Sequence, residues 1–446
     1  MATGKRGWRG MVAAVMVILL TACGGGSGDD ACSVPAQRNW LRGYMLDWYY
    51  WTGLSPNPEP EAYGSVQQYF DALRFAGSAS VPRDRWSYIS DSASYTQFFT
   101  EGKTLGYGLF VNGVESRALY EAGQPFGALK VRFVEAQSPA AGLLLRGDTI
   151  VSLNGRSAAE LVAANDFSAL SPSSEGQVLN AVIDFGSGPT PVTLAAATYS
   201  LTPVTATEVI DLGNGQRAGY LVLKDFVTQA EAPLADAFTA FRTQGATELI
   251  LDLRYNGGGR VSTSAMLASL VAGVANNNAA FTTLRYNSRH PSANFTYNFA
   301  ATAPGFSRVV VLTGSRTCSA SELVVNGLKP YVNVVTLGDT TCGKPFGFSP
   351  ATYCSSTYSA VNFESVNALG LGQYYDGISA TCAAADDFSG VLGAPTEKLL
   401  AAATGYLQTG TCPVSVATAQ PRALSILRRL RALGTEPGER QGMWAD

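Results

Sequence analysis

The sequence has 446 residues, of which 46% are hydrophobic, and a formal net charge of −3. This length accommodates two or three domains with separate hydrophobic cores, and the composition is that of a globular chain rather than a disordered one. The slightly acidic balance provides no broad basic surface for a phosphate backbone, which argues against nucleic acid as a partner.

The first 22 residues have the pattern of an export signal. Basic side chains precede an apolar stretch, residues 11–20, that is shorter than the ~20 residues needed to span a bilayer. The stretch ends in Leu20-Thr21-Ala22-Cys23, which resembles the lipobox of bacterial lipoproteins. The resemblance implies a signal peptide over 1–22, lipidation of Cys23 and a flexible tether over 23–35. Gly24 follows the cysteine, where aspartate is associated with inner-membrane retention, so the implied location is the outer membrane, facing the periplasm. The alternative is an ordinary secretory signal in which Cys23 merely lies near the cleavage site.

Six further cysteines follow Cys23. An even number in an exported protein indicates disulfides, with fifteen possible pairings. Because there is no CxxC pair and only one histidine, His290, neither a metal site nor another cofactor is expected. A bridge between Cys318 and Cys342 would fix the residues beside them, although two small buried thiols are an equally good interpretation. The six are Cys32, Cys318, Cys342, Cys354, Cys382 and Cys412.

The region 36–100 is rich in aromatic residues at spacings of three and four. This spacing predicts helices with a bulky apolar face, which is more often a packing surface than a ligand site. Prolines at 56, 58 and 60 predict a loop between helical pieces.

The region 103–204 contains short β-like stretches and then Gly147-Asp148, a strand pattern and Asn154-Gly155. This order resembles the PDZ domain, in which Gly-Asp turns into a strand that ends in an Asn-Gly turn. The earlier Leu105-Gly106-Tyr107-Gly108-Leu109 is similar to the PDZ loop whose backbone N–H groups bind a peptide C-terminus. Read alone, this loop is equally well a plain β-turn.

The region 205–410 alternates strand and helix patterns. Short apolar runs such as 218–223 and 248–253 are typical of strands covered on both faces, and an amphipathic stretch, 234–241, separates them. An α/β core is therefore predicted. The tail, 411–446, carries arginines among leucines, which suits a membrane-surface helix or, as the simpler interpretation, a solvated, frayed end.

Ser319 and Lys344 are the strongest candidates for chemistry. A serine nucleophile needs a base within hydrogen-bond reach, and with a single histidine in the chain a buried, neutral lysine is the better candidate. Apolar neighbours of Lys344, among them Phe346 and Phe348, would lower its pKa by desolvation. Ser319 at the start of a helix lies near free N–H groups, so Ala320 N–H, with Gly258 or Gly259, is expected to form the oxyanion hole.

Three motifs carry a resemblance to a known family. These are Asp252-Leu253-Arg254-Tyr255-Asn256-Gly257-Gly258-Gly259, Ser319-Ala320-Ser321-Glu322 and Gly343-Lys344, with a shorter likeness at 84–89. They are similar, in order and in spacing, to motifs of the C-terminal processing, or tail-specific, proteases. The resemblance implies a multidomain α/β protein with an N-terminal helical region, a PDZ-like β domain and a crotonase/ClpP-like α/β peptidase core. It also implies a serine endopeptidase that cuts envelope proteins near unstructured, free C-termini.

Other functions stay open at this point. The main alternative is an inactive or gated PDZ lipoprotein scaffold that binds protein C-termini, and a Ser-Lys esterase or amidase for small molecules is a third. Ser319 with Glu322 also fits a plain helix capping box. Two departures from the family motifs favour a weak or gated enzyme. Phe348 stands where family members often have a polar residue, and Pro330 stands where some members have an aspartate. In place of that polar residue, Thr340, Thr341 or a backbone carbonyl is expected to orient Lys344.

Overall fold

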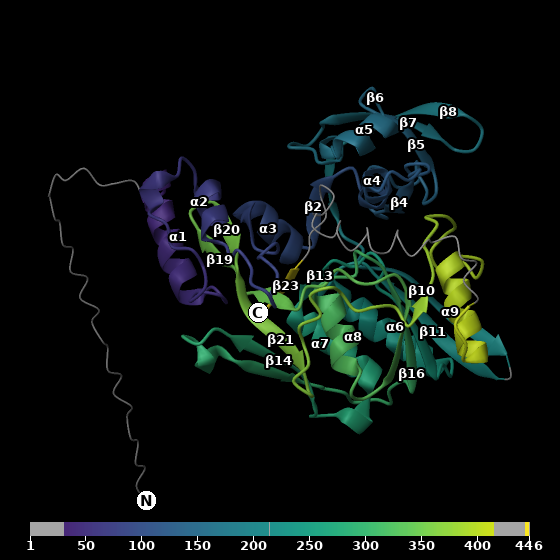
Figure 1. Ribbon diagram of the computed structural model, residues 1–446. Coiled ribbons are helices and arrows are strands. Elements are labelled where there is room, and N and C mark those ends of the chain that lie inside the picture. The colour runs from purple at the N-terminus through teal and green to yellow at the C-terminus, as the bar shows by residue number, and fades with distance from the viewer. Residues whose placement is uncertain (1–30, 214, 414–441, 446) are drawn as a thin grey trace, which may run out of the picture.

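The computed structural model describes residues 31–213, 215–413 and 442–445 (Figure 1). No helix in these three stretches is long and apolar enough to cross a bilayer. The predicted signal peptide and Cys23 lie outside the described residues.

The tether was predicted to cover residues 23–35, and its predicted last residue is wrong. Helix α1 (Val34–Trp48) begins within it, because the Ser33 hydroxyl caps the helix by accepting from the Ala36 N–H and a proline occupies the first turn. Cys32 forms a disulfide with Cys354. Residues from Cys32 onward are therefore part of the folded structure and not of a flexible tether.

The N-terminal region is not purely helical. After α1 it contains strand β1 (Tyr88–Asp91), which pairs with β20 (Ser356–Ser359) and through it with β19 (Ala351–Tyr353). Aromatic side chains of the N-terminal region share one hydrophobic cluster with residues 346–361 and Trp444. The predicted helices are present, and the strand was not predicted because it is short and its partners lie more than 260 residues away. The other helices here are η1 (Pro60–Ala62), α2 (Val66–Leu73) and α3 (Ser92–Phe99).

A second unit, 103–204, has a hydrophobic core of its own. The predicted strand and turn are present: β5 (Thr149–Leu153) is followed by Asn154 and Gly155, which both have a positive φ, as a tight hairpin turn requires. The remaining elements are β2 (Lys103–Gly106), β3 (Leu109–Val111), α4 (Gly113–Glu121), β4 (Val131–Val134), β6 (Arg156–Ser157), α5 (Ala158–Ala164), η2 (Ser168–Leu170), β7 (Val178–Asp184), β8 (Pro189–Ala195) and β9 (Ala197–Ser200).

The third unit confirms the predicted α/β core. Its first sheet has the order β10-β11-β12-β16-β17-β22, parallel except for the β10–β11 pair. Helices α6, α7 and α8 lie on one face, and α9 packs on the other. The strands are β10 (Val204–Gly213), β11 (Gln216–Leu223), β12 (Glu248–Asp252), β16 (Arg308–Thr313), β17 (Asn333–Gly338) and β22 (Cys382–Ala383). The helices are η3 (Thr228–Ala230), α6 (Glu231–Thr243), α7 (Val261–Ala272), η4 (Val274–Asn276), η5 (Pro291–Ala293), α8 (Ala320–Leu328) and α9 (Lys398–Thr409).

A second six-stranded sheet lies against α8, in the order β13-β23-β18-β21-β14-β15. It contains β23 (Gly442–Trp444), so the prediction of a frayed tail is wrong for the last described residues, which pair on both sides. The tail over 414–441 lies outside the described residues. The other strands are β13 (Gly258–Arg260), β14 (Ala280–Tyr286), β15 (Phe295–Asn298), β18 (Phe346–Phe348) and β21 (Val361–Asn367).

Candidate active site

Ser319 lies where strand β16 has ended and helix α8 begins. Its backbone has φ of 59° and ψ of −111°, a conformation that costs a non-glycine residue of the order of 1–3 kcal/mol and that the surrounding structure must enforce. The residue is fully buried, and among the described residues its Oγ has no hydrogen-bond partner. Ser319 is the N-cap residue of α8, and a strained, buried backbone of this kind is also typical of functional sites.

Lys344 comes two residues before β18 and is 1% exposed. Its Nζ lies 4.1 Å from the centre of the Phe348 ring. Burial lowers the pKa of Lys344 to about 7, against the opposing charges of Asp84 and Glu322. A substantial fraction of this lysine is therefore neutral at physiological pH and able to accept a proton.

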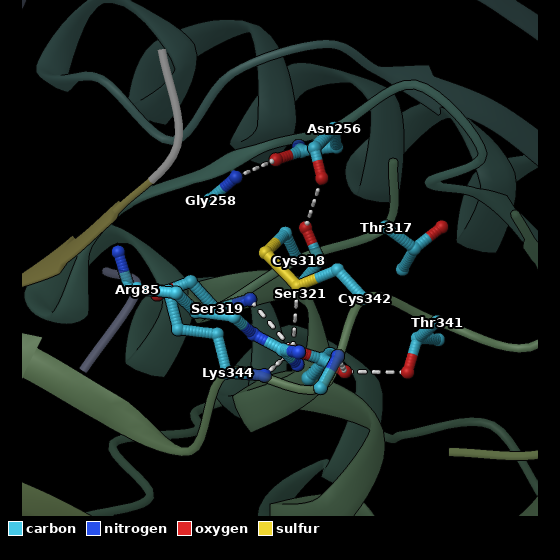
Figure 2. Close-up of a disulfide and its surroundings, with 12 residues drawn as sticks. Arg85, Asn256, Gly258, Thr317, Cys318, Ser319, Ser321, Thr341, Cys342 and Lys344 are labelled. Carbon is cyan, nitrogen blue, oxygen red and sulfur yellow. Dashed lines mark hydrogen bonds between the residues drawn. A yellow bond between two sulfur atoms is a disulfide. The ribbon is translucent and has the colours of Figure 1, made fainter. Parts of the chain in front are cut away.

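A buried carboxylate joins the serine segment to the lysine segment (Figure 2). Glu322, in the first turn of α8, accepts the N–H groups of Ser319 at 2.9 Å and of both Gly343 and Lys344 at 2.8 Å. It also accepts the Thr341 hydroxyl. Burial raises the pKa of Glu322, and these donors oppose the shift by stabilising its charged form. Glu322 therefore sets the separation of the two segments.

This contact was missed in the sequence. The pattern Ser-x-x-Glu was interpreted as a helix capping box, and Glu322 does accept the Ser319 N–H, but its carboxylate also accepts the N–H groups of Gly343 and Lys344. Thr341 was considered as a group that orients Lys344 directly, but its hydroxyl donates to Glu322 instead. No local signal showed that the carboxylate would bind a segment about twenty residues ahead.

The same two segments are joined covalently. Cys318 and Cys342 form a disulfide with Cα atoms 5.1 Å apart, one residue before Ser319 and two before Lys344 (Figure 2). The sulfur atoms lie close enough to the Glu322 carboxylate for a metal ion to bind all three residues. Since the sulfurs are bonded to each other, neither is available as a thiolate ligand. The third bridge joins Cys382 and Cys412.

The predicted oxyanion residues come from two elements beside Ser319. Ala320 is the first residue of α8, where the helix leaves its first N–H groups without an intrahelical acceptor. Gly258 and Gly259 form the start of β13, and a side chain on Gly259 would lie 2.1 Å from the Phe226 carbonyl oxygen. The Gly258 N–H donates to Asn256 Oδ1 at 2.8 Å, so this donor is engaged in the structure.

Asp84 is a second residue whose position the sequence did not disclose. Its carboxylate accepts from the Tyr49 hydroxyl at 2.6 Å and from the N–H groups of Trp86 and Ser87 at 2.9 and 3.0 Å. Its charge raises the pKa of Lys344 and so counteracts part of the effect of burial. The segment 84–89 was noticed only as a likeness, without a role for the aspartate.

One cavity connects the lysine to the second unit. Its volume is about 660 Å³, and its wall includes Lys344, Arg85 and Lys224. All five residues of the predicted peptide loop also line it: Leu105, Gly106, Tyr107, Gly108 and Leu109. Gly108 has a positive φ, and a side chain there would collide with Ser138. The structure therefore brings this loop and the candidate base to one cavity.

Two other polar groups lie apart from this chemistry. Arg254 forms a buried double hydrogen bond with Glu397 and an ion pair with Asp252 at 2.8 Å, which is a structural arrangement. His290 is half-buried, stacks on Trp48 and contacts Asp47 at 2.9 Å.

Comparison with known proteins defines the class. A sequence profile of peptidase family S41 matches residues 217–367, and one of the peptidase S41 N-terminal domain matches residues 36–88. The solved structure of a Bacteroides fragilis protein assigned to the S41 proteases superposes with a TM-score of 0.64 at 23% identity and covers 83% of this chain and 97% of that one. The photosystem II D1 C-terminal processing protease gives 0.51 at 18% identity, over 79% and 93%. The fold is thus that of a family of serine-type peptidases.

Two curated relatives narrow the assignment. The carboxyl-terminal-processing protease of Synechocystis sp. is 32% identical over 156 residues, which are 35% of each chain. The chloroplastic carboxyl-terminal-processing peptidase 1 of Arabidopsis thaliana is 32% identical over 148 residues, 32% of this chain and 28% of the relative. The matches span about a third of the length of these relatives. Over this stretch the chain is similar to the C-terminal processing proteases.

Proposed function

We propose that the protein is a serine endopeptidase that cleaves bacterial envelope proteins near unstructured C-termini, with Ser319 as nucleophile and Lys344 as base. The observation that carries the proposal is the junction itself: a strained, unpartnered serine and a lysine with a pKa of about 7 are held by one carboxylate, Glu322. Neutral Lys344 takes the Ser319 proton as Oγ attacks the scissile carbonyl and then returns it to the leaving amine. Water releases the acyl-enzyme.

The oxyanion formed in this reaction needs two donors. Ala320 N–H and an N–H of the glycine pair supply them, and Gly258 donates to the oxyanion only after leaving Asn256. The unit 103–204 acts as a PDZ domain that binds the substrate's C-terminus. The loop 105–109 and the ammonium of Lys224, both on the cavity wall, suit a peptide carboxylate. Lipidation of Cys23 and outer-membrane attachment complete the proposal.

The alternative is an inactive or gated scaffold. It is favoured by one observation: Ser319 Oγ has no hydrogen bond to Lys344 or to any other described residue. Catalytic hydrogen bonds often tighten only when substrate binds, so this geometry agrees with a gated enzyme as well as with a scaffold.

Cleavage of an unfolded protein with an apolar C-terminal tail tests the proposal. Ser319→Ala and Lys344→Ala are each expected to lower the rate by at least about 10³-fold while the fold persists. Ser321→Ala and Lys329→Ala are matched controls, since Ser321 donates to Asn256 O and Lys329 is exposed at the end of α8. A wild-type protein as inert as both dyad variants, yet still able to bind the tail, would establish the scaffold instead.

A further inference from the structure

Residues 442–445 lie between the two halves of the active site. Strand β23 runs parallel to β13 on one side, with Gly258 opposite Gly442, and parallel to β18 on the other, with Phe348 opposite Trp444. Ala445 N–H donates to the Phe348 carbonyl at 2.9 Å. A stretch far along the sequence therefore fills a one-strand slot in the second sheet.

Both walls of this slot carry proposed catalytic groups. Strand β13 begins with Gly258 and Gly259, and the ring of Phe348 in β18 lies beneath Lys344 Nζ. Figure 2 shows Gly258 and Lys344 on either side of the disulfide, with Ser319 close to the lysine. A peptide strand in this slot has its backbone beside the proposed oxyanion glycines and beside the strand that follows Lys344, which is where a substrate of the proposed dyad must lie.

The slot also has side-chain sites on both faces. Met443 is fully buried in the peptidase core, and Trp444, which is 6% exposed, packs against Phe99 with ring centres 3.9 Å apart. Gly347 in β18 makes room for the strand, since a side chain there would lie 2.8 Å from the Met443 carbonyl oxygen. Strand addition with alternating side chains in separate pockets is a common mode of peptide recognition.

We infer that the slot between β13 and β18 binds an extended segment of the peptide substrate, and that residues 442–445 occupy it as an intramolecular competitor. The inference rests on the proposed peptidase function. It assigns a substrate class, namely extended peptides that present a long apolar side chain followed by an aromatic one. A tethered strand competes at an effective concentration of the order of millimolar, so the substrate must displace it.

Peptide binding tests the slot without requiring catalysis. The probe is a fluorescein-labelled nonapeptide with the sequence of residues 438–446, measured by anisotropy with Ser319→Ala protein. Removal of residues 442–446 is expected to tighten probe binding by at least tenfold relative to the full chain. A control peptide with serine at the methionine and tryptophan positions is expected not to bind. Equal affinity of the probe for the full and shortened chains would overturn the inference.

Cleavage kinetics supply the second test. In protein with Ser319 intact, the shortened chain is expected to show a KM at least tenfold lower with kcat unchanged, and the unlabelled peptide to inhibit it competitively. Trp444→Ala in the full chain, whose melting temperature is measured in parallel, is expected to lower KM in the same direction. Activation of the shortened chain by the peptide, or an unchanged KM in folded Trp444→Ala protein, would show that β23 is a permanent structural strand.

The two tests separate the two proposals. If no variant cleaves but the shortened chain alone binds the probe, the slot stands and the peptidase function falls. If the protein cleaves normally and KM is the same with and without residues 442–446, the peptidase function is supported and the slot inference is wrong.

Discussion

The junction between serine and lysine and the boundary between the unit 103–204 and the peptidase core are held together in different ways. The junction depends on a fully buried carboxylate and a disulfide, both within a few residues of Ser319 and Lys344. The boundary carries ion pairs between side chains of the two units, such as Glu115 with Arg316 and Arg146 with Asp386. The proposed chemistry is thus built into a part fixed by buried and covalent contacts, whereas the proposed recognition unit is attached by ion pairs between side chains. Changes at the junction should abolish activity, and changes at the boundary should adjust it.

Replacing Glu322 with Gln is expected to have the largest effect. The amide group of glutamine cannot accept from all the donors that Glu322 now binds, so at least one buried N–H loses its partner, at about 1–3 kcal/mol or more. We expect kcat to fall by at least about 100-fold and the melting temperature to fall. A kcat within twofold of wild type would contradict the role of Glu322 at the junction.

Two of the disulfides can be compared because removing either should destabilise the fold by a similar amount. Bridges Cys318–Cys342 and Cys382–Cys412 close loops of similar length, with sequence separations of 24 and 30, so the loop model assigns each about 3–4 kcal/mol. Replacing either pair with serines is expected to lower the melting temperature alike. Only the Cys318→Ser/Cys342→Ser variant is expected to lose activity, by about tenfold or more in kcat. Equal activity losses in both variants would mean that the first bridge serves stability alone.

Asp84→Asn tests the electrostatics of the base. Negative charge at Asp84 favours protonated Lys344, so its removal lowers a pKa that is about 7 in the wild type. Since neutral lysine is the active form, the rise of rate with pH should move to lower pH. Rates should increase at pH 6 and stay unchanged at pH 8. Tyr49→Phe, which removes a hydrogen bond to Asp84 but keeps the charge of Asp84, is the control. A rise of rate that moved to higher pH in Asp84→Asn would contradict the role of Lys344 as the base.

Glu115→Gln at the boundary is expected to have the smallest effect. It removes the charge of Glu115, which is 21% exposed, and leaves the amide oxygen to accept from Arg316 in place of the two charge-assisted hydrogen bonds. The KM for a substrate with an apolar C-terminal tail should rise two- to threefold, and kcat for a short peptide without a tail should stay the same. A tenfold fall in kcat would show that the boundary controls the chemistry itself.

The sequence predicted what depends on local pattern. The apolar runs of β11, β12, β16 and β17 were recognised because their periodicity is that of strands covered on both faces. Ser319 and Lys344 were predicted as the catalytic pair because their flanking residues resemble family motifs. The aromatic surface of the N-terminal region was correctly interpreted as a packing surface, although its partner was not identified.

Contacts across long sequence separations escaped prediction. Asp84 affects a lysine 260 positions ahead, and nothing around it indicates that partner. Strand β23 is three residues long and follows a charged stretch, so the sequence offers neither periodicity nor length to reveal it. Its stability comes from β13, β18 and the buried side chains of Met443 and Trp444, all of them tertiary contacts.

The Cys32–Cys354 bridge has a mechanical consequence. Cys354 lies in the turn between β19 and β20, so the bridge links the beginning of the described chain covalently to the third unit, 322 residues away. A pulling force applied to the chain ahead of Cys32 is therefore transmitted through the sulfur atoms to this hairpin, and α1 bears little of the load. The protein can be held under tension at that end without unwinding its first helix, as long as the bridge stays oxidised.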